Sequence, residues 1–496
     1  MFRRILRGSA FATVMLLLLT STVLAGSTTK TLSTNYTLVN FGGSEATVQV
    51  EYLKSDGTLW DADDANESFT IPADGGQVQI RQYFDSTMTA GEGSAVVSSS
   101  QPLGSIVQIQ ARGQVPSSGA YQGYSEGSSK WYIPLAAHMG VSASGTVNTQ
   151  IVVQNVGSDA VNFEVKMIGL DGILAYTKPV TNLGVGVAFN YDLADETNLP
   201  SNWFGSAVVE TTSGTLAVVS NIFLGADALQ SLNAFPQEKL ATSWNVPSFM
   251  SKLSNGLNTV VTVQNLSGGT IAVGNMSLDC VKDPNSPDPA SFSATNGTAV
   301  LNTASYNFNS YTGGATFPTG WYGSCQVTAP GDVVAFVQLR YIAAGINKGA
   351  AAYEAIPAGG LDTTAFIPLI AKRLGNGFAS VVTIQNLTAD PALVTLTYTP
   401  SPTECPVDLC DINDDEVVDE LDAIVVEDLP IGPNGSIMRN HRVPSGATNS
   451  EPAMPDSWVG SLKVTSNKAI NGFVQLTYYK NISGDTFMSH GVFTQP

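Results

Sequence analysis

An acidic segment between residues 411 and 422 has the residue types and spacing that best suit a chemical role in this chain. Counted from Asp411 as position one, oxygen-bearing side chains fall at positions 1, 3, 5, 9 and 12, and Val417 offers its backbone carbonyl at position 7. Hard oxygen donors at these intervals wrap around a single calcium ion. The sequence therefore predicts one Ca²⁺ site, with side-chain ligands Asp411, Asn413, Asp415, Asp419 and Asp422.

The segment resembles the calcium-binding repeat of dockerins, which also favours Asp at the last position, and the resemblance implies the same ligands. Two features depart from that pattern. Position six, where the backbone turns sharply and glycine is usual, is Glu416. Dockerins also have two such loops, whereas this chain has one. We therefore expect a lone structural ion and no cohesin docking; the alternative is a solvated acidic loop without metal.

The four cysteines predict two local disulfides. Cys405 and Cys410 lie in one loop at the entrance of the acidic segment, and Cys280 and Cys325 fall within one repeat. For the second pair, two free thiols buried in a core are the alternative.

Motifs typical of enzymes are absent from the sequence. The histidines His138, His441 and His490 are scattered, and no His-Glu-x-x-His or phosphate-binding glycine loop followed by lysine occurs. A pair of glycosidase carboxylates has no sequence signature, so a secreted hydrolase stays open as the least favoured class. The expectation is a protein that is not an enzyme.

An internal repeat organises the chain, and three anchors mark each of its four copies. The first anchor is a strand that ends in asparagine, at Asn40, Asn155, Asn265 and Asn386. The second is a Gly-Ser pair that begins at Gly93, Gly205, Gly323 and Gly460, preceded in the last three copies by Pro-x-x-Trp. The third lies 15 residues after that glycine, at Gln108, Ser220, Gln338 and Gln475.

Within each copy, segments such as 47–52 alternate apolar and polar residues, and turn-forming residues separate them. This pattern predicts half-buried strands. Copies of about 110 residues favour an all-β chain of four tandem immunoglobulin-like β-sandwich modules in an extended array; a β-propeller is the rival, but its blades are shorter. Prolines 134, 247 and 368 suggest edge or crossing strands that join neighbouring modules. The expected division is a signal peptide at 1–25 and repeats at 26–130, 131–243, 244–364 and 365–496, the last with an insertion at 405–428.

The N-terminus predicts export. Three arginines precede an apolar run from Ala10 to Leu19, and a small-residue stretch ends at Ala25, as signal peptidase requires. The formal charge is −19, or about −22 without the leader, which disfavours nucleic acid and anionic membranes as partners. We therefore expect a secreted or surface-held protein, with no membrane span in the mature chain.

The Pro-Leu entry, the Val-Gln-Asn strand end and the Trp-x-Gly-Ser strand resemble tandem sandwich repeats of secreted bacterial proteins of the Chloroflexota type. The resemblance implies a fold and no defined activity. A structural protein of the cell surface, such as a surface-layer, sheath, filament or stalk component, is the favoured function, with self-assembly through open sheet edges and residues 27–35 as a candidate donor strand.

An adhesin or carbohydrate-binding protein is the alternative function. It requires exposed aromatic residues, and Trp60, Trp131 and Trp244 are the ones to inspect because they lie outside the repeated Trp motif. The recurrent asparagines are interpreted as residues that satisfy backbone groups where a strand meets a turn, with a ligand site as the alternative.

Overall fold

The computed structural model describes residues 14–20, 31–60, 64–112, 117–142, 145–225, 228–342, 349–447, 449–451, 453–480, 485 and 487–495. This part of the chain is nearly all β, with several antiparallel sheets, as the sequence predicted. It contains no helix long and apolar enough to cross a membrane. The ends of the predicted signal peptide, including its cleavage site, lie outside the described residues.

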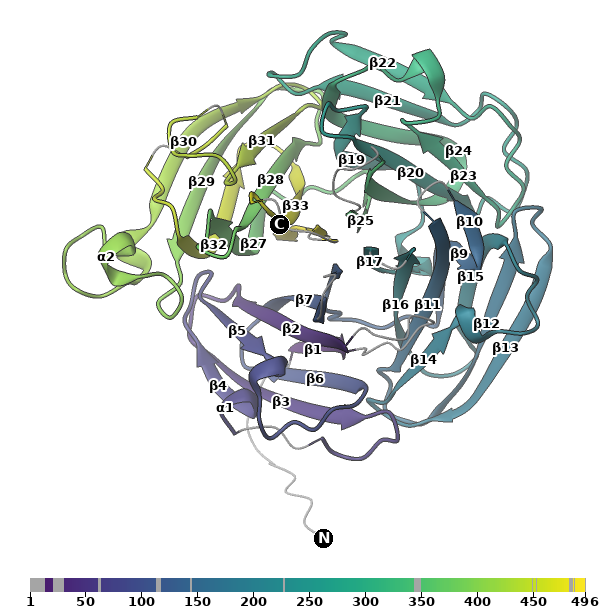
Figure 1. The fold of residues 1–496 in the computed structure, drawn as a ribbon, viewed down its shortest axis with the longest axis horizontal. Helices are drawn as coiled ribbons and strands as arrows, with labels where there is room; N and C mark the ends of the chain where they lie inside the picture. The colour runs from purple at the N-terminus through teal and green to yellow at the C-terminus, as the bar shows by residue number, and fades with distance from the viewer. Residues whose placement is uncertain are drawn as a thin grey trace.

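The strands form an inner and an outer sheet in each of four successive units around one axis (Figure 1). In the first unit the outer sheet has the order β4 (Ser68–Ile71), β3 (Ala46–Lys54), β6 (Gly93–Ser99) and β1 (Val14–Thr20). Its inner sheet has the order β5 (Gln77–Arg81), β2 (Thr31–Asn40), β7 (Leu103–Arg112) and β8 (Ser118–Gln122). Two short helices, α1 (Asp64–Glu67) and η1 (Gln82–Phe84), lie in its connections.

The second unit repeats both strand orders. Its outer sheet comprises β13 (Leu174–Leu183), β12 (Val161–Gly169), β15 (Trp203–Thr211), β9 (Lys130–His138) and β18 (Phe235–Pro236). Its inner sheet comprises β14 (Ala188–Asp192), β11 (Gly145–Asn155), β16 (Leu216–Leu224) and β17 (Ala228–Asn233), and β10 (Gly140–Ser142) also pairs with β11. The 3-10 turns η2 (Leu193–Asp195) and η3 (Gln237–Lys239) complete the unit.

In the third unit one long strand, β24 (Trp321–Tyr341), serves both sheets and joins them into one of eight strands. Its outer part comprises β22 (Ser291–Thr295), β21 (Ser277–Lys282), β24, β19 (Ala241–Ser251) and β26 (Ile356–Pro357). Its inner part comprises β23 (Ser305–Asn309), β20 (Leu257–Asn265), β24 and β25 (Ala350–Glu354), and η4 (Gly314–Thr316) precedes β24.

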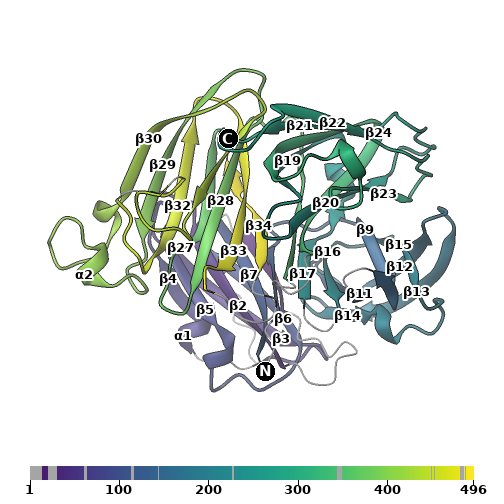
Figure 2. The same cartoon turned by 45° about the horizontal axis from the view of Figure 1, so that its top comes forward.

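The fourth unit has the same plan with an insertion. Its outer sheet comprises β30 (Ile424–Ile431), β29 (Ala392–Pro400), β32 (Trp458–Ser466), β27 (Thr364–Lys372) and β35 (Phe493–Gln495). Its inner sheet comprises β31 (Ser436–Asn440), β28 (Phe378–Asn386), β33 (Ile470–Tyr478) and β34 (Met488–Gly491). The insertion holds α2 (Val407–Cys410) and η5 (Glu420–Asp422) and projects from the rim (Figures 1 and 2).

Burial differs between the two kinds of sheet. The outer strand β3 alternates buried and exposed residues over most of its length, which confirms the half-buried strand predicted for residues 47–52. All nine residues of the inner strands β20 and β28 are buried. The inner strands lose alternation because one face packs on the outer sheet of the same unit and the other faces neighbouring units.

The four units close into a ring, so the predicted extended array is wrong. The innermost strands pack in sequence, β8 on β17, β17 on β25, β25 on β34, and β34 returns to β8 (Figure 1). Gln122 Nε2 of the first unit donates to the carbonyl of Gly491 in the fourth, at 2.8 Å. An open rod would leave the outward faces of these buried inner strands uncovered, and closure covers them.

The serine of each Gly-Ser pair forms the same kind of contact with the neighbouring unit in all four copies. Its hydroxyl donates to a backbone carbonyl in the loop before the following unit's β5, β14, β23 or β31, and the fourth serine bonds back to the first unit. The pairs, with their Oγ–O distances, are Ser94–Gly186 (2.5 Å), Ser206–Thr303 (2.7 Å), Ser324–Asn434 (2.9 Å) and Ser461–Gly75 (3.0 Å). The second anchor of the repeat is therefore an interface motif.

The proline-containing strands β9, β19 and β27 are not the edge or crossing strands predicted from the sequence. Each lies inside the outer sheet of its own unit, between a long strand and a short terminal one. We call β9, β19 and β27 the entry strands of their units. The pairing register shifts at the proline of each entry strand, so that two of its residues oppose the single serine of the Gly-Ser pair. Proline is tolerated there because a β-bulge frees its nitrogen from the ladder.

Candidate functional site

The acidic loop of the fourth unit begins after α2 and ends in η5. Its first ligand candidate, Asp411, accepts the backbone N–H groups of Asp415 at 3.2 Å and Glu416 at 2.8 Å. Its last, Asp422, is fully buried and accepts the N–H groups of Ile412 at 2.6 Å and Asn413 at 3.1 Å. The two ends of the predicted ligand set therefore fold over the same short stretch of backbone.

The position-six residue takes the conformation that glycine usually provides. Glu416 has φ of 67° and Asp414 has φ of 61°, both in the left-handed region. The departure at position six is therefore one of residue type and not of backbone shape.

The remaining predicted ligands are arranged around hydrogen bonds within the loop. Asn413 Oδ1 accepts the N–H of Asp415, Asp415 Oδ1 accepts that of Val417, and Asp419 Oδ1 accepts that of Leu421. No group of three or more His, Cys, Asp or Glu placed to hold a metal occurs in the described residues. The oxygens are of the type that calcium takes, but here they bind backbone N–H groups, and the calcium site stays a prediction.

Hydrogen bonding also determines the charge of Asp422. Burial alone raises the pKa of this carboxyl, but the N–H groups of Asp419, Ile412 and Asn413 together lower its pKa below the usual value. Asp422 is therefore an ionised carboxylate held by the loop backbone at neutral pH.

Both predicted disulfides are present. Cys405 and Cys410 are bonded at the entrance of the acidic loop, with an S–S distance of 1.92 Å. Cys280 and Cys325, bonded at 1.96 Å, are direct cross-strand neighbours in β21 and β24. The alternative of two free thiols at 280 and 325 is excluded.

In each copy the strand-end asparagine forms hydrogen bonds with backbone groups of the turn that follows, as the sequence indicated. All four are fully buried, and each side-chain amide donates to the carbonyl four residues later; the distances are 2.7 Å for Asn40, 2.8 Å for Asn155 and 2.7 Å for both Asn265 and Asn386. Each Oδ1 also accepts the N–H two residues later. Each amide also donates to a second carbonyl 28 to 45 residues later, as Asn155 does to Leu183 at the end of β13, at 2.9 Å. Since both ends of each side chain are occupied, none is available for a ligand.

The tryptophans do not form a sugar-binding platform. Trp60, Trp131 and Trp244 retain only 7%, 2% and 1% of their surface, and the three repeated tryptophans are buried as well. The indole nitrogens of Trp131 and Trp244 donate to backbone carbonyls of their own units. Their role is in the core.

The structure also contains a buried polar network that spacing in the sequence did not reveal. Ser380 Oγ and Tyr398 Oη each lie 3.3 Å from a ring nitrogen of His441, and Tyr398 donates to Glu451 at 2.9 Å. Arg439 forms an ion pair with Glu451. Ser380, Tyr398, His441 and Glu451 are fully buried, so no substrate reaches them, and the network fixes the loop after β31. Only the presence of charged residues within apolar strands could have signalled it.

Burial sets the protonation state of this network. It lowers the pKa of His441 to about 3, with a smaller contribution from Lys372 and Arg439, so the imidazole is neutral. Burial likewise raises the pKa of Tyr398. His490, buried in β34, has its pKa lowered to about 4 for the same reason.

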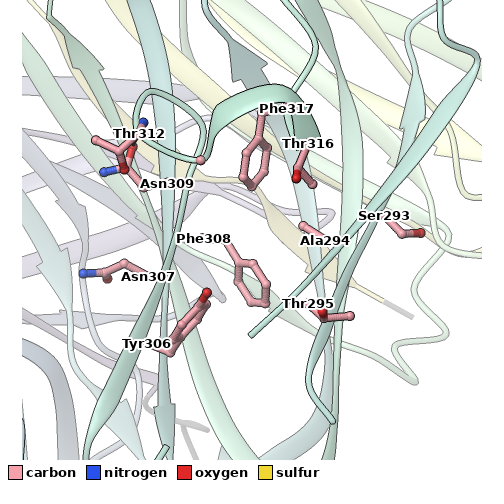
Figure 3. Close-up of a pocket in the computed structure, with 11 residues that line it drawn as sticks. Ser293, Ala294, Thr295, Tyr306, Asn307, Phe308, Asn309, Thr312, Thr316 and Phe317 are labelled. Carbon is pink, nitrogen blue, oxygen red and sulfur yellow. Dashed lines mark hydrogen bonds between the residues drawn. The ribbon is translucent and has the colours of Figure 1, made fainter. Parts of the chain in front are cut away.

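Two surface hollows among the described residues are further candidates for ligand binding. One of about 490 Å³ opens in the third unit between β22, β23 and η4, and it is lined by Tyr306, Phe308, Phe317 and several amide and hydroxyl side chains (Figure 3). The other, of about 400 Å³, lies between the first and second units, where Asn190 Nδ2 donates to Glu92 at 2.6 Å. In the first hollow Phe308 and Phe317 are buried, and the partly exposed ring of Tyr306 beside amide groups suits a neutral polyhydroxylated molecule.

Comparisons with known proteins assign no family. No family model and no curated protein matches the chain. Among solved structures, the crystal structure of Thermotoga maritima 1070 is 13% identical and covers 23% of this chain and 97% of its own, with a TM-score of 0.19. A tetra-tandem repeat from the extending region of a large adhesion protein is 11% identical and covers 97% and 99%, with a TM-score of 0.11. Similarity this low supports no functional argument.

Proposed function

We propose that the chain is an exported, non-enzymatic structural protein of the cell surface, whose working form is a ring of four immunoglobulin-like sandwich units. The observation that carries the proposal is the use made of the repeated polar residues. The four asparagines satisfy their own turns, and the four serines join each unit to the next. The repeated polar residues therefore maintain the turns and the arrangement of the units. A component of a surface layer or sheath requires such a fixed arrangement.

The acidic loop belongs to this proposal as a calcium-stabilised projection. It projects from the rim (Figure 2), and Cys405–Cys410 closes its entrance, where the adjacent Glu404 forms an ion pair with Arg81 of the first unit at 2.7 Å. Extracellular calcium is commonly millimolar, so even a weak site of this kind fills.

Cell fractionation combined with electron microscopy tests the proposal. The protein, detected by antibody in its native host, is expected in the envelope or culture fluid, and purified material is expected as ring-shaped particles or ordered arrays of them. Recovery from the cytosol, or turnover of a substrate by the purified chain, would contradict it.

Carbohydrate binding is the second candidate, favoured by the hollow of the third unit. Tyr306 presents a partly exposed ring to this hollow, and the buried Phe308 supports it edge to face at 5.1 Å (Figure 3). Titration with surface polysaccharides followed by calorimetry, using Tyr306→Ala, tests this function. The control is Tyr311→Ala, an exposed tyrosine outside the lining. Equal binding by the two variants would exclude the hollow.

A further inference from the structure

One strand of the first unit comes from a part of the chain that is predicted to be removed. β1, residues 14–20, is the last strand of the outer sheet and pairs antiparallel with β6 over seven residues, from Val14↔Ser99 to Thr20↔Gly93. In the other three units the entry strands β9, β19 and β27 occupy this position. Residues 14–19 also belong to the apolar run of the predicted signal peptide, which extends from Ala10 to Leu19. If the signal peptide is cleaved on export, residues 14–20 cannot remain in the sheet as β1.

Cleavage after Ala25 would leave β6 with an open edge that none of the described strands of the mature chain is free to fill. Every described strand already has a partner within its own sheet. Only five residues, 26–30, would precede β2, and β2 itself pairs with β7 from Thr31↔Arg112 onward. Residues 31–35 are therefore not available as the donor strand expected from the sequence. A second mature copy has the same shortage, so it cannot supply the strand either.

The edge that would open lacks the protection that two of the four rim edges have. An exposed edge strand is normally protected by proline or charge. The rim strand β13 contains Lys178 and Pro179, and β30 contains Glu427, Asp428 and Pro430. The rim strands β4 and β22 have neither a charge nor a proline, but they are only four and five residues long. β6 has the sequence Gly-Ser-Ala-Val-Val-Ser-Ser, without a charge or a proline. Nothing in its composition prevents another strand from pairing with it.

We infer that removal of the leader makes β6 an acceptor for an extended apolar strand of about seven residues, donated antiparallel by a different polypeptide. This inference rests on the proposed export of the chain. The donor's chemistry follows from the entry strands of the other units: apolar residues with a small or proline residue where the serine of the Gly-Ser pair creates a bulge. Strand addition of this kind combines main-chain hydrogen bonds with burial of alternate side chains.

The inference is tested on the mature chain, residues 26–496, with synthetic strands as probes. One peptide spans residues 12–22 with flanking lysines for solubility, a second spans 130–138, and a third, spanning 31–40, is the control because its strand is already present. Hydrogen exchange is followed at the amides of β6 and, as an internal reference, of β15. The expected result is that β6 amides exchange at least tenfold more slowly with either of the first two peptides and are unaffected by the third.

A chain of residues 13–496, made without export under oxidising conditions, provides the matched control with the strand in place. Its β6 amides should be protected and should not respond to peptide. A mature chain that folds only with peptide also supports the inference. Protection of β6 equal to that of β15 in the mature chain alone would overturn it.

N-terminal sequencing of the exported protein separates this inference from the proposed function. A start near Gly26 is the expected result. A surface protein that retains residues 14–20 would overturn the acceptor inference while leaving the structural function intact, whereas a chain that is never exported would remove the basis of both.

Discussion

At the scale of single residues, the repeated asparagines show that a polar residue can recur for structural reasons alone. Replacing Asn155 with alanine removes two amide donors and leaves the buried carbonyl of Leu183 without its partner. We expect the free energy of unfolding to fall by about 2–4 kcal/mol, because an unsatisfied buried group retains its full desolvation cost. Urea denaturation measures the change. Asn275→Ala, at an exposed position of the third unit, is the control and should change stability by less than about 0.5 kcal/mol.

His441 predicts a pH dependence. Because its folded pKa of about 3 lies below the unfolded value of about 6.5, the unfolded chain binds the proton first as the pH falls. The stability contribution of the neutral imidazole is therefore present above pH 6.5 and is lost between pH 6.5 and pH 3. Between pH 7 and pH 5 the loss is about 2 kcal/mol.

His441→Gln, compared with the unsubstituted chain at each pH, isolates this effect from other titrating groups. The stability difference between the two proteins should shrink as the pH falls from 7 to 5. A difference that is constant with pH would show that His441 does not titrate on unfolding.

At the residue scale, predictions from the sequence were reliable where one residue type has one dominant local use. Asparagine at a strand end and cysteines in one repeat are examples, and the structure confirms both interpretations. The network around His441 was not predicted, because Tyr398 and Ser380 lie 43 and 61 positions from His441 in the sequence and only packing brings them together.

At the scale of elements, the glycine of the Gly-Ser pair is required by the close approach of the neighbouring strand. A Cβ at Gly205 would lie 2.0 Å from the carbonyl oxygen of Ile168, and the other three glycines of this motif meet the equivalent strand in the same way. Gly205→Ala is therefore expected to destabilise the protein by about 3 kcal/mol or more, since backbone must move. Gly269→Ala, which meets nothing within 4 Å, is the matched control. Chemical denaturation should separate the two variants; equal stabilities would contradict the packing argument.

The acidic loop gives a second prediction at this scale. Millimolar calcium should raise the melting temperature, because an ion bound only by the folded loop stabilises it by mass action. A double variant, Asp415→Asn with Asp419→Asn, should abolish the response without disturbing the buried Asp422. Asp408→Asn, outside the ligand set, is the control. Calorimetry with calcium and then with chelator measures the effect, and no shift in any protein would mean that the loop is merely acidic.

Element types were predicted better than element partners. Alternation in residues 47–52 identified a half-buried strand, but proline at 134 suggested an edge where the structure has a bulge inside a sheet. Both settings free the proline nitrogen from the ladder, so the residue alone does not distinguish them.

At the scale of the whole molecule, the sequence did not indicate that the four units close into a ring. The repeat length and anchors are the same for four units in a rod or in a ring. The deciding contacts join distant residues, as when Asp485 of the fourth unit accepts the N–H groups of Leu229 at 2.8 Å and Ala350 at 3.1 Å. Burial raises the pKa of this carboxyl. One core cluster contains residues of both the first and the second unit, such as Tyr36 and Val153, so these units share a hydrophobic interior.

Small-angle X-ray scattering of the purified mature protein tests this closure most directly. A compact chain of this size has a radius of gyration of about 23 Å, and four units placed end to end would give roughly twice that value or more. The closed ring predicts the smaller value, unchanged on dilution. A radius near the larger value, with the scattering of an elongated particle, would contradict the ring and restore the rod.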